Sequence, residues 1–117
     1  MKEFMMIFTA GEPHYETLSP SDMQQRLSLW QAWIEDLKAK NIYVDGRALK
    51  SQRFLAESAD GILTDGPFVE AKELVSGFFV VKAVDYEAAA EISRGFPDYD
   101  LGAKVMISEI ETFSDYQ

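Results

Sequence analysis

The stretch LVSGFFVVKAV, residues 74–84, is rich in valine and phenylalanine and predicts a β-strand. In a strand, Phe78 and Val80 point to one face of the sheet, while Phe79 and Val81 point to the other. Both faces of the sheet are therefore expected to be apolar. Helices can cover one face, and a second subunit is the economical cover for the other. The pattern thus predicts a homodimer whose sheets pack face to face.

A long helix is predicted upstream of this strand, from Ser19 to about Asn41. Ser19 fits the N-cap position, because its hydroxyl can accept a hydrogen bond from a backbone N–H, and Pro20 fits the first helical position. Apolar residues then recur at spacings of four, three, four and three: Met23, Leu27, Trp30, Ile34 and Leu37. This spacing is typical of one buried helix face.

The remaining segments complete an α+β pattern. Further strands are predicted at residues 3–10, 42–44, 53–57, 62–64 and 103–110, and the third and fourth of these can pair as a hairpin. The short strand is expected to end in an Asp45-Gly46 turn, and Asp85 is expected to cap a second helix that runs to Arg94. This order is that of a ferredoxin-like βαββαβ fold with an extra hairpin, in which both helices pack on one face of an antiparallel sheet. We expect a single domain over residues 1–111 and a polar C-terminal tail over residues 112–117.

The composition limits the chemistry that is available. The 117 residues carry a formal net charge of -9, which argues against nucleic acid or an anionic membrane as a partner. The chain has no cysteine and one histidine, which excludes thiolate metal sites, cysteine nucleophiles and sites that need two imidazoles. The apolar run from Phe4 to Phe8 is too short for a signal-peptide core or a membrane span. We expect a cytoplasmic protein without a metal or a cofactor.

The densest cluster of chemical groups is DGPFVEAKE, residues 65–73. One interpretation is a turn followed by solvated charges. The alternative is a cleft in which Asp65, Glu70 and Lys72 hold a polar ligand or move a proton, with Phe68 as a hydrophobic anchor. No spacing rule makes these residues a known catalytic set.

This motif, followed by Gly77-Phe78-Phe79, resembles the signature of the DGPF branch of the YCII-related proteins. The resemblance extends over most of the chain, including the first strand and the helix that starts at Leu18-Ser19-Pro20. It implies a dimeric α+β barrel, in which two ferredoxin-like subunits pack through their sheets.

The resemblance implies less about activity. Related YCII proteins carry a histidine in the first helix and an aspartate before the last strand, proposed as a catalytic pair. An ungapped placement puts Trp30 at the histidine position and Phe96, before Pro97, at the aspartate position. Neither side chain can exchange a proton with a substrate, and Asp98, two residues further on, could replace the acid only. His-Asp catalysis is therefore not carried over.

The single histidine, His14, follows the first strand between Glu12 and Glu16. It is either a solvated loop residue or a proton carrier at the mouth of a cleft between helix and sheet. A metal site built from these three residues lacks any recognised spacing, so we expect none.

Aromatic and cationic side chains supply further ligand candidates. Trp30, Trp33, Phe78 and Phe79 either belong to the core or line an aromatic pocket. Arg47, like Arg53, either binds a ligand anion or forms a surface ion pair.

Two functions of different classes follow. The first is a dimeric small-molecule-binding or regulatory module. The second is a cofactor-free enzyme of the isomerase, dehydrochlorinase or monooxygenase type that acts on a small cyclic or aromatic compound, an analogy from fold alone. In the second, Asp65 or His14 would carry the proton, and Lys72 or Arg47 would bind an anion.

Overall fold

The computed structural model describes residues 1–11, 17–56, 58–61, 63–66 and 74–116, and the backbone alone at 63–66. The helices and strands, in chain order, are β1 (Lys2–Thr9), α1 (Pro20–Ala39), β2 (Tyr43–Ala48), β3 (Arg53–Ala56), β4 (Leu63–Gly66), β5 (Val75–Ala83), α2 (Tyr86–Ser93) and β6 (Val105–Glu109). Short 3-10 helices lie at Tyr99–Leu101 and Phe113–Tyr116.

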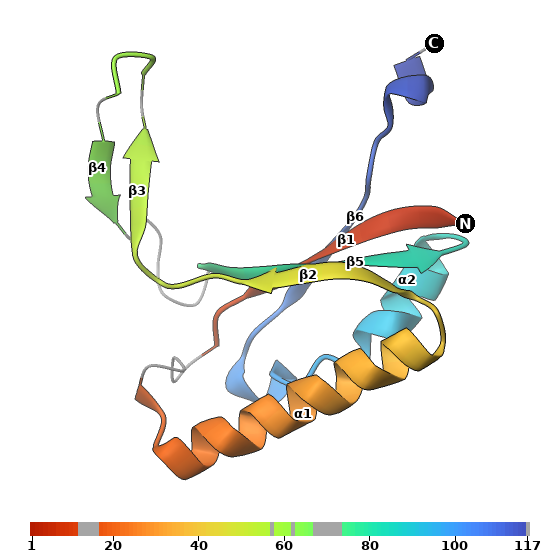
Figure 1. Cartoon of the computed structure of the whole chain (residues 1–117), viewed down its shortest axis with the longest axis horizontal. Helices are drawn as coiled ribbons and strands as arrows, with labels where there is room; N and C mark the ends of the chain where they lie inside the picture. The colour runs from red at the N-terminus through yellow and green to blue at the C-terminus, as the bar shows by residue number, and fades with distance from the viewer. Residues whose placement is uncertain (12–16, 57, 62, 67–73, 117) are drawn as a thin grey trace.

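Four strands form one sheet in the order β2-β5-β1-β6, and every neighbouring pair is antiparallel. Both helices cover the same face of this sheet (Figure 1). The expected α+β, ferredoxin-like arrangement is thus confirmed, and β3 and β4 form the extra hairpin. Among the described residues, no helix is long and apolar enough to cross a membrane.

The helix starts follow the expected capping chemistry. The hydroxyl of Ser19 accepts a hydrogen bond from the backbone N–H of Asp22 at 3.1 Å, and Pro20 occupies the first turn of α1. At α2, the Asp85 carboxylate accepts from the N–H of Ala88 at 2.8 Å. Each cap satisfies a donor that the helix itself leaves without a partner, which fixes where the helix begins.

The core lies between the helices and one face of the sheet. Its largest fully buried side chains are Phe4, Met6, Phe8 and Val81. Around Phe8, aromatic rings from α1, β5 and the segment after α2 pack within 5.0–6.0 Å of its ring centroid: Trp30, Trp33, Phe79 and Phe96. The alternation expected for β5 is confirmed, because Phe79 and Val81 are buried while Phe78 and Val80 on the other face are half-buried.

Two details of the sequence interpretation are wrong. The first concerns α1, whose buried side chains are Trp33 and Leu37, whereas Leu27 is 48% exposed. Trp33 is buried because it shares a helix face with Trp30 and Leu37, at spacings of three and four residues. Leu27 lines a cavity between α1 and the sheet, so it is only half covered.

The second error is the turn expected at Asp45-Gly46, which lies inside β2. The pairing register with β5 shifts between Tyr43 and Asp45, which is the geometry of a β-bulge. Gly46 lies against Phe79, and a Cβ at this position would be 2.5 Å from a ring carbon, so only glycine fits here without a shift. A glycine inside a strand marks a bulge and a close approach as readily as a turn.

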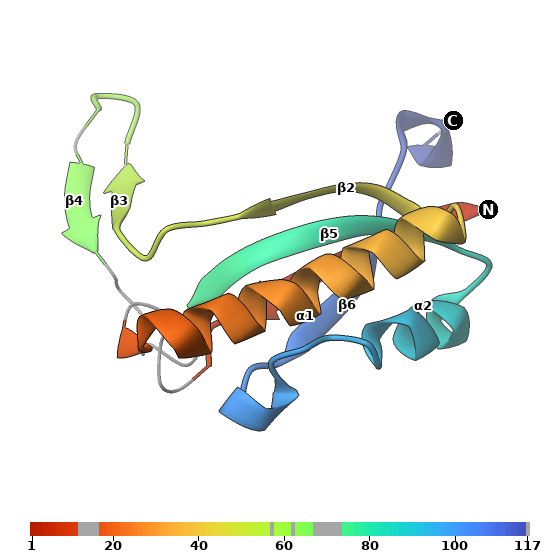
Figure 2. The same cartoon turned by 60° about the horizontal axis from the view of Figure 1, so that its bottom comes forward.

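The β3–β4 hairpin and the C-terminal segment rise from the sheet face that the helices leave uncovered (Figure 2). The hairpin turn expected before residue 62 is present: Gly61 has a positive φ of 78°, and its N–H donates to the carbonyl of Ser58. The radius of gyration is 16.1 Å, against about 13 Å for a compact domain of this length. The two projecting segments account for the difference.

Candidate functional site

A cavity of about 310 Å³ lies between α1 and the sheet. Its apolar wall includes Phe8, Leu27, Trp30, Ile34 and Phe79. Its polar lining residues include Thr9, Tyr43, Arg47, Ser76 and Asp98. The volume is at the lower end of the range for small-molecule sites, and a mainly apolar wall with a few polar groups is their usual composition.

Two glycines create room at the sheet side of this cavity. A Cβ at Gly77 would lie 2.5 Å from the carbonyl oxygen of Arg47, and a Cβ at Gly46 would lie 2.8 Å from the Tyr43 hydroxyl. Both residues line the cavity. Because Gly46 and Gly77 have no side chains, β2 and β5 can approach closely, and the cavity beside these two residues stays open.

The bulge in β2 decides which of its side chains face the cavity. Tyr43 pairs with Val81 and Gly46 pairs with Phe79, so both lie on the face that carries the helices, although they are three residues apart. Val44, between them, is 41% exposed. In a regular strand without a bulge, residues three positions apart, such as Tyr43 and Gly46, would lie on opposite faces.

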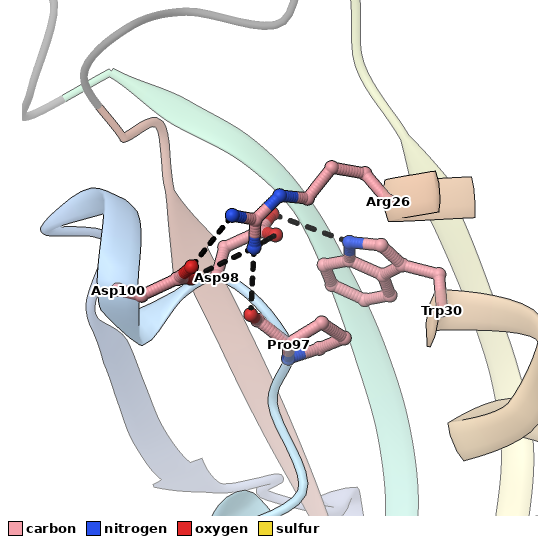
Figure 3. A network of polar contacts seen from close by, with 5 residues as sticks. All are labelled: Arg26, Trp30, Pro97, Asp98 and Asp100. Carbon is pink, nitrogen blue, oxygen red and sulfur yellow. Dashed lines mark hydrogen bonds and ion pairs between the residues drawn. The ribbon is translucent and has the colours of Figure 1, made fainter. Parts of the chain in front are cut away.

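At one end of the cavity, Arg26 of α1 joins the helix to the segment before β6 (Figure 3). Its guanidinium donates two hydrogen bonds to the Asp100 carboxylate, at 2.6 and 2.7 Å, and one to the carbonyl of Pro97, at 3.1 Å. It also forms an ion pair with Asp98 at 3.4 Å. The bidentate pair holds the pKa of Asp100 below its usual range, chiefly through the hydrogen bonds from Arg26.

Asp98 is the buried member of this network. Its side chain is 8% exposed, and it accepts a hydrogen bond from the indole Nε1 of Trp30 at 3.2 Å, in addition to the ion pair with Arg26. Trp30 and Asp98 both line the cavity. A buried carboxylate needs such partners, because it has left its hydration shell. The pair therefore places a fixed negative charge and a flat aromatic surface in the same wall.

The ungapped placement put Phe96 at the aspartate position of the relatives. Phe96 is 4% exposed and stacks on Phe8, with ring centroids 5.0 Å apart, so it belongs to the core. Asp98 is instead the residue of this segment that faces Trp30. The structure thus pairs Trp30 with an acid two residues beyond the one that the placement chose.

Tyr43 brings a hydroxyl to the opposite, sheet side of the cavity. Burial raises the pKa of this hydroxyl, and the nearby Asp45 carboxylate raises it further. The group therefore stays protonated at neutral pH and can donate a hydrogen bond. Asp45 is itself ionised, because the hydrogen bond from the N–H of Gly46 lowers the pKa of its carboxyl, with Arg47 adding to the effect.

Arg47 borders the cavity, but its guanidinium is engaged nearby. It donates to the Asp45 carboxylate and to the carbonyl of Gly46, and its side chain is 66% exposed. In the pairing register it stands opposite Phe78, on the sheet face without helices. Of the two interpretations given for Arg47, the surface ion pair is present in the structure.

The structure describes only some of the other candidate residues that the sequence suggested. His14, Phe68, Glu70 and Lys72 lie outside the described residues. Asp65 belongs to β4, where its backbone pairs with Phe54 of β3. The roles suggested for these five residues stay predictions. Trp30 is the predicted ligand-binding residue that the structure places with its side chain in the cavity wall.

Sequence reasoning did not identify Arg26 or Tyr43 as members of the site. Arg26 is separated by 72 residues from Asp98, so no local pattern links them. A signal did exist, because Arg26 and Trp30 are four residues apart and therefore share a helix face.

Within the described ranges, no group of three or more acidic, histidine or cysteine side chains could hold a metal ion.

Comparison with solved structures found a 5-chloro-2-hydroxyhydroquinone dehydrochlorinase from Burkholderia phenoliruptrix AC1100, in complex with 2,5-dihydroxybenzoquinone. The alignment has a TM-score of 0.48 and 14% sequence identity, and it covers 96% of this chain and 97% of the other. No curated protein matched the sequence. The model of the YCII-related domain matches residues 5–111. The chain therefore belongs to the YCII-related family.

Proposed function

We propose that this protein is a homodimeric small-molecule-binding module whose ligand occupies the cavity between α1 and the sheet. The observation that carries the proposal is the hydrogen bond from the Trp30 indole to the buried Asp98 carboxylate, 3.2 Å long, in the wall of that cavity. An indole N–H donates a hydrogen bond but has no basic nitrogen. The pair can therefore position a ligand but cannot pass a proton in the way that a His-Asp pair does.

The lining groups define the class of ligand. Trp30 and Phe79 offer flat aromatic surface, which favours a planar apolar body. Asp98 accepts hydrogen bonds, and the protonated Tyr43 hydroxyl can donate one. The best fit is a small aromatic or cyclic compound that carries at least one hydroxyl or amino group as a donor and one oxygen as an acceptor.

The proposed dimer rests on the uncovered face of the sheet. Met5, Ile7, Phe78 and Val80 lie on this face and are half-buried, and Met106 beside them is 63% exposed. Their strands β1, β5 and β6 are adjacent, so the side chains form one continuous apolar surface. A surface of this kind favours association with a second copy. Sedimentation at micromolar concentration tests it: a dimer is expected, and a monomer would contradict it.

A cofactor-free enzyme is the second candidate, and one observation favours it. Asp98 is the one carboxylate among the described residues that line the cavity, and a carboxylate in a largely apolar wall is a candidate general base. Asp65 and His14 remain the proton carriers suggested by the sequence. The contacts with Arg26 and Trp30 weigh against Asp98 as a base, because each of them occupies one of the two carboxylate oxygens that would have to accept the proton.

Ligand binding is tested by tryptophan fluorescence with a panel of hydroxylated and amino-substituted aromatic compounds. Ala48 of β2 lines the cavity, so Ala48→Phe should fill it and abolish saturable binding. Ala32 lies on the exposed side of α1, and Ala32→Phe is the matched control that should bind as the wild type does. Equal binding by both variants would place the ligand elsewhere and contradict the proposal.

The same panel separates binding from catalysis. Each compound that binds is incubated with the wild type and with Asp98→Asn, and its consumption is followed by chromatography. The proposal predicts that bound compounds are recovered unchanged. Consumption by the wild type that the Asp98→Asn variant loses would overturn the non-catalytic role and establish the enzyme.

A further inference from the structure

A second hollow, of about 350 Å³, opens between the two helices and is called the interhelix groove below. Its walls are the last two turns of α1 and the C-terminal end of α2, together with Ile42 from the segment after α1. α2 lies beside this end of α1 in both views of the chain (Figures 1 and 2). Among the described residues, none lines both the interhelix groove and the cavity between α1 and the sheet. The two hollows are therefore separate.

Trp33 brings a hydrogen-bond donor without a partner to the interhelix groove. The side chain is 93% buried, since only 7% of the residue is exposed, and its indole Nε1 has no hydrogen-bond partner among the described residues. No fully sealed side-chain nitrogen or oxygen in the described part of the chain lacks a partner, so this Nε1 borders space that solvent can reach. Trp33 lines the interhelix groove, which provides that space. A nearly buried donor of this kind needs an acceptor from outside the chain.

Gly95 keeps the indole N–H of Trp33 accessible. A Cβ at Gly95 would lie only 2.4 Å from Nε1 of Trp33, so a larger residue would cover the donor or displace the ring. Gly95 does not have a positive φ, so its backbone conformation is open to other residues. Its close approach to the indole is the feature that requires glycine. The groove is thus open at the point where the unpartnered donor lies.

The charges around the interhelix groove disfavour an anion. The groove lies at the C-terminal ends of both helices, where backbone carbonyl groups carry partial negative charge. Its charged lining residues are Asp36, Glu91 and Lys40, so two are acidic and one is basic. Lys40 pairs with Asp36 at 2.9 Å, and Arg94 pairs with Glu91 at 3.3 Å. A neutral molecule avoids this repulsion, and an N–H group on it can donate to a carboxylate at the rim.

We propose that the interhelix groove is a second ligand site, which binds a small neutral amide. The amide carbonyl oxygen would accept the hydrogen bond from Nε1 of Trp33. The apolar body of the ligand would lie against Leu37 and Ile92, which line the groove, and the amide N–H would donate to the Glu91 carboxylate. The inference depends neither on the ligand of the cavity beside Trp30 nor on the proposed dimer.

The two tryptophans allow each site to be followed separately by NMR. The ¹⁵N-labelled protein is titrated with cyclohexanecarboxamide and with δ-valerolactam, and the Trp30→Phe variant identifies the indole N–H signal of Trp33. At least one of these amides should shift the Trp33 signal saturably and more than the Trp30 signal. The Ala48→Phe variant, in which the other cavity is filled, should show the same shift. A Trp33 signal that neither amide shifts saturably would show that the groove holds only water, which overturns the proposal.

The ligand class is tested by changing the charge of the probe. Cyclohexanecarboxylate has the same body as cyclohexanecarboxamide but is an anion at pH 7, and it should bind about fivefold more weakly. Glu91→Gln should reduce this difference. Glu87→Gln is the matched control, because Glu87 is an exposed residue of α2 that does not line the groove, and it should keep the difference. Equal binding of amide and carboxylate to the wild type would overturn the amide class, and an unchanged difference in Glu91→Gln would contradict the contact with Glu91.

The position of the ligand is tested at Gly95 and Trp33. Gly95→Ala should abolish the binding of the amide, because the new Cβ would cover Nε1. Trp33→Phe removes the donor without breaking a hydrogen bond of the chain, so it serves as a second variant if Gly95→Ala does not fold. Saturation-transfer NMR on the amide should show binding about tenfold weaker in Trp33→Phe than in the wild type. Binding of wild-type strength in either folded variant would place the amide elsewhere and overturn the proposal.

Discussion

The indole Nε1 of Trp30 donates a hydrogen bond to Oδ2 of Asp98 across 3.2 Å, and the two residues are 68 positions apart in the chain. The bond joins α1 to the segment that leads into β6, at the end of the cavity (Figure 3). Trp30 also packs edge-on against Phe8 and Phe96, with ring centroids 5.1 and 5.5 Å apart, so the ring cannot turn away from the carboxylate without losing core contacts. This contact therefore contributes to the fold as well as to the site.

The contribution of this hydrogen bond is measurable by a double-mutant cycle. Trp30→Phe keeps a ring but removes the donor, and it should destabilise the protein by about 1–3 kcal/mol because a buried acceptor loses a partner. With Asp98→Asn as the second change, urea unfolding should give a coupling energy of about 1–2 kcal/mol between the two sites. A coupling energy below about 0.3 kcal/mol would mean that the two side chains act independently.

Removal of the Arg26 guanidinium should destabilise the protein more than loss of the hydrogen bond between Trp30 and Asp98. Arg26→Met leaves the buried Asp98 carboxylate without its ion pair and should lower the free energy of unfolding by about 2–4 kcal/mol. Lys40→Met is the control, since it removes a cation at the C-terminal end of α1 whose pair with Asp36 is more than half exposed. That control should cost less than about 0.5 kcal/mol, measured in the same urea series. Similar costs for both variants would contradict the special role of Arg26.

The ion pair between Arg26 and Asp100 also predicts how the stability of the protein depends on pH in the acid range. Because the pKa of Asp100 is lowered in the folded state, its ion pair contributes stability at pH values above the unfolded pKa of about 4. This contribution is lost as the pH falls through the folded pKa. Thermal unfolding at a series of pH values should therefore show a shallower loss of stability below about pH 4 in Asp100→Asn than in the wild type. Parallel curves would show that the pair has no effect on stability.

The bulge of β2 gives a prediction about packing. Gly46→Ala would place a Cβ 2.5 Å from the ring of Phe79, so either β2 or this core ring must shift. The expected cost is about 1–3 kcal/mol in urea unfolding. Gly61→Asn is the control, because that position is open and asparagine tolerates its positive φ of 78°. A neutral Gly46→Ala substitution would mean that the strand has more room than the structure indicates.

Local signals predicted the fold well. Ser19, Pro20 and Asp85 are capping residues whose chemistry depends on the first turn of their own helix, so the sequence nearby is sufficient. The alternation of Phe78 and Phe79 likewise depends only on the pleat of one strand. Elements defined by neighbours in sequence are therefore the ones that sequence reasoning found.

The errors and omissions have a common physical origin. Asp45-Gly46 has the composition of a turn, and only its packing against Phe79 shows that it is part of a bulge. The contact between Arg26 and Asp98 depends on the path of the chain through α2, which no local pattern encodes. Long-range packing thus decides the details of the site, while short-range rules decide the elements that carry it.

The most direct test of the account is whether a ligand binds beside Trp30. The chain has two tryptophans, so an NMR spectrum of the ¹⁵N-labelled protein contains two indole N–H signals, which the Trp30→Phe variant assigns. Trp30 lines the cavity, and Trp33 does not. When a hydroxylated aromatic compound is titrated in, we predict a saturable shift of the Trp30 signal that is larger than that of Trp33 and that Ala48→Phe abolishes. The proposed site would be contradicted if no compound of the panel gave a saturable shift of the Trp30 signal. It would also be contradicted if the Ala48→Phe variant showed the same shift as the wild type.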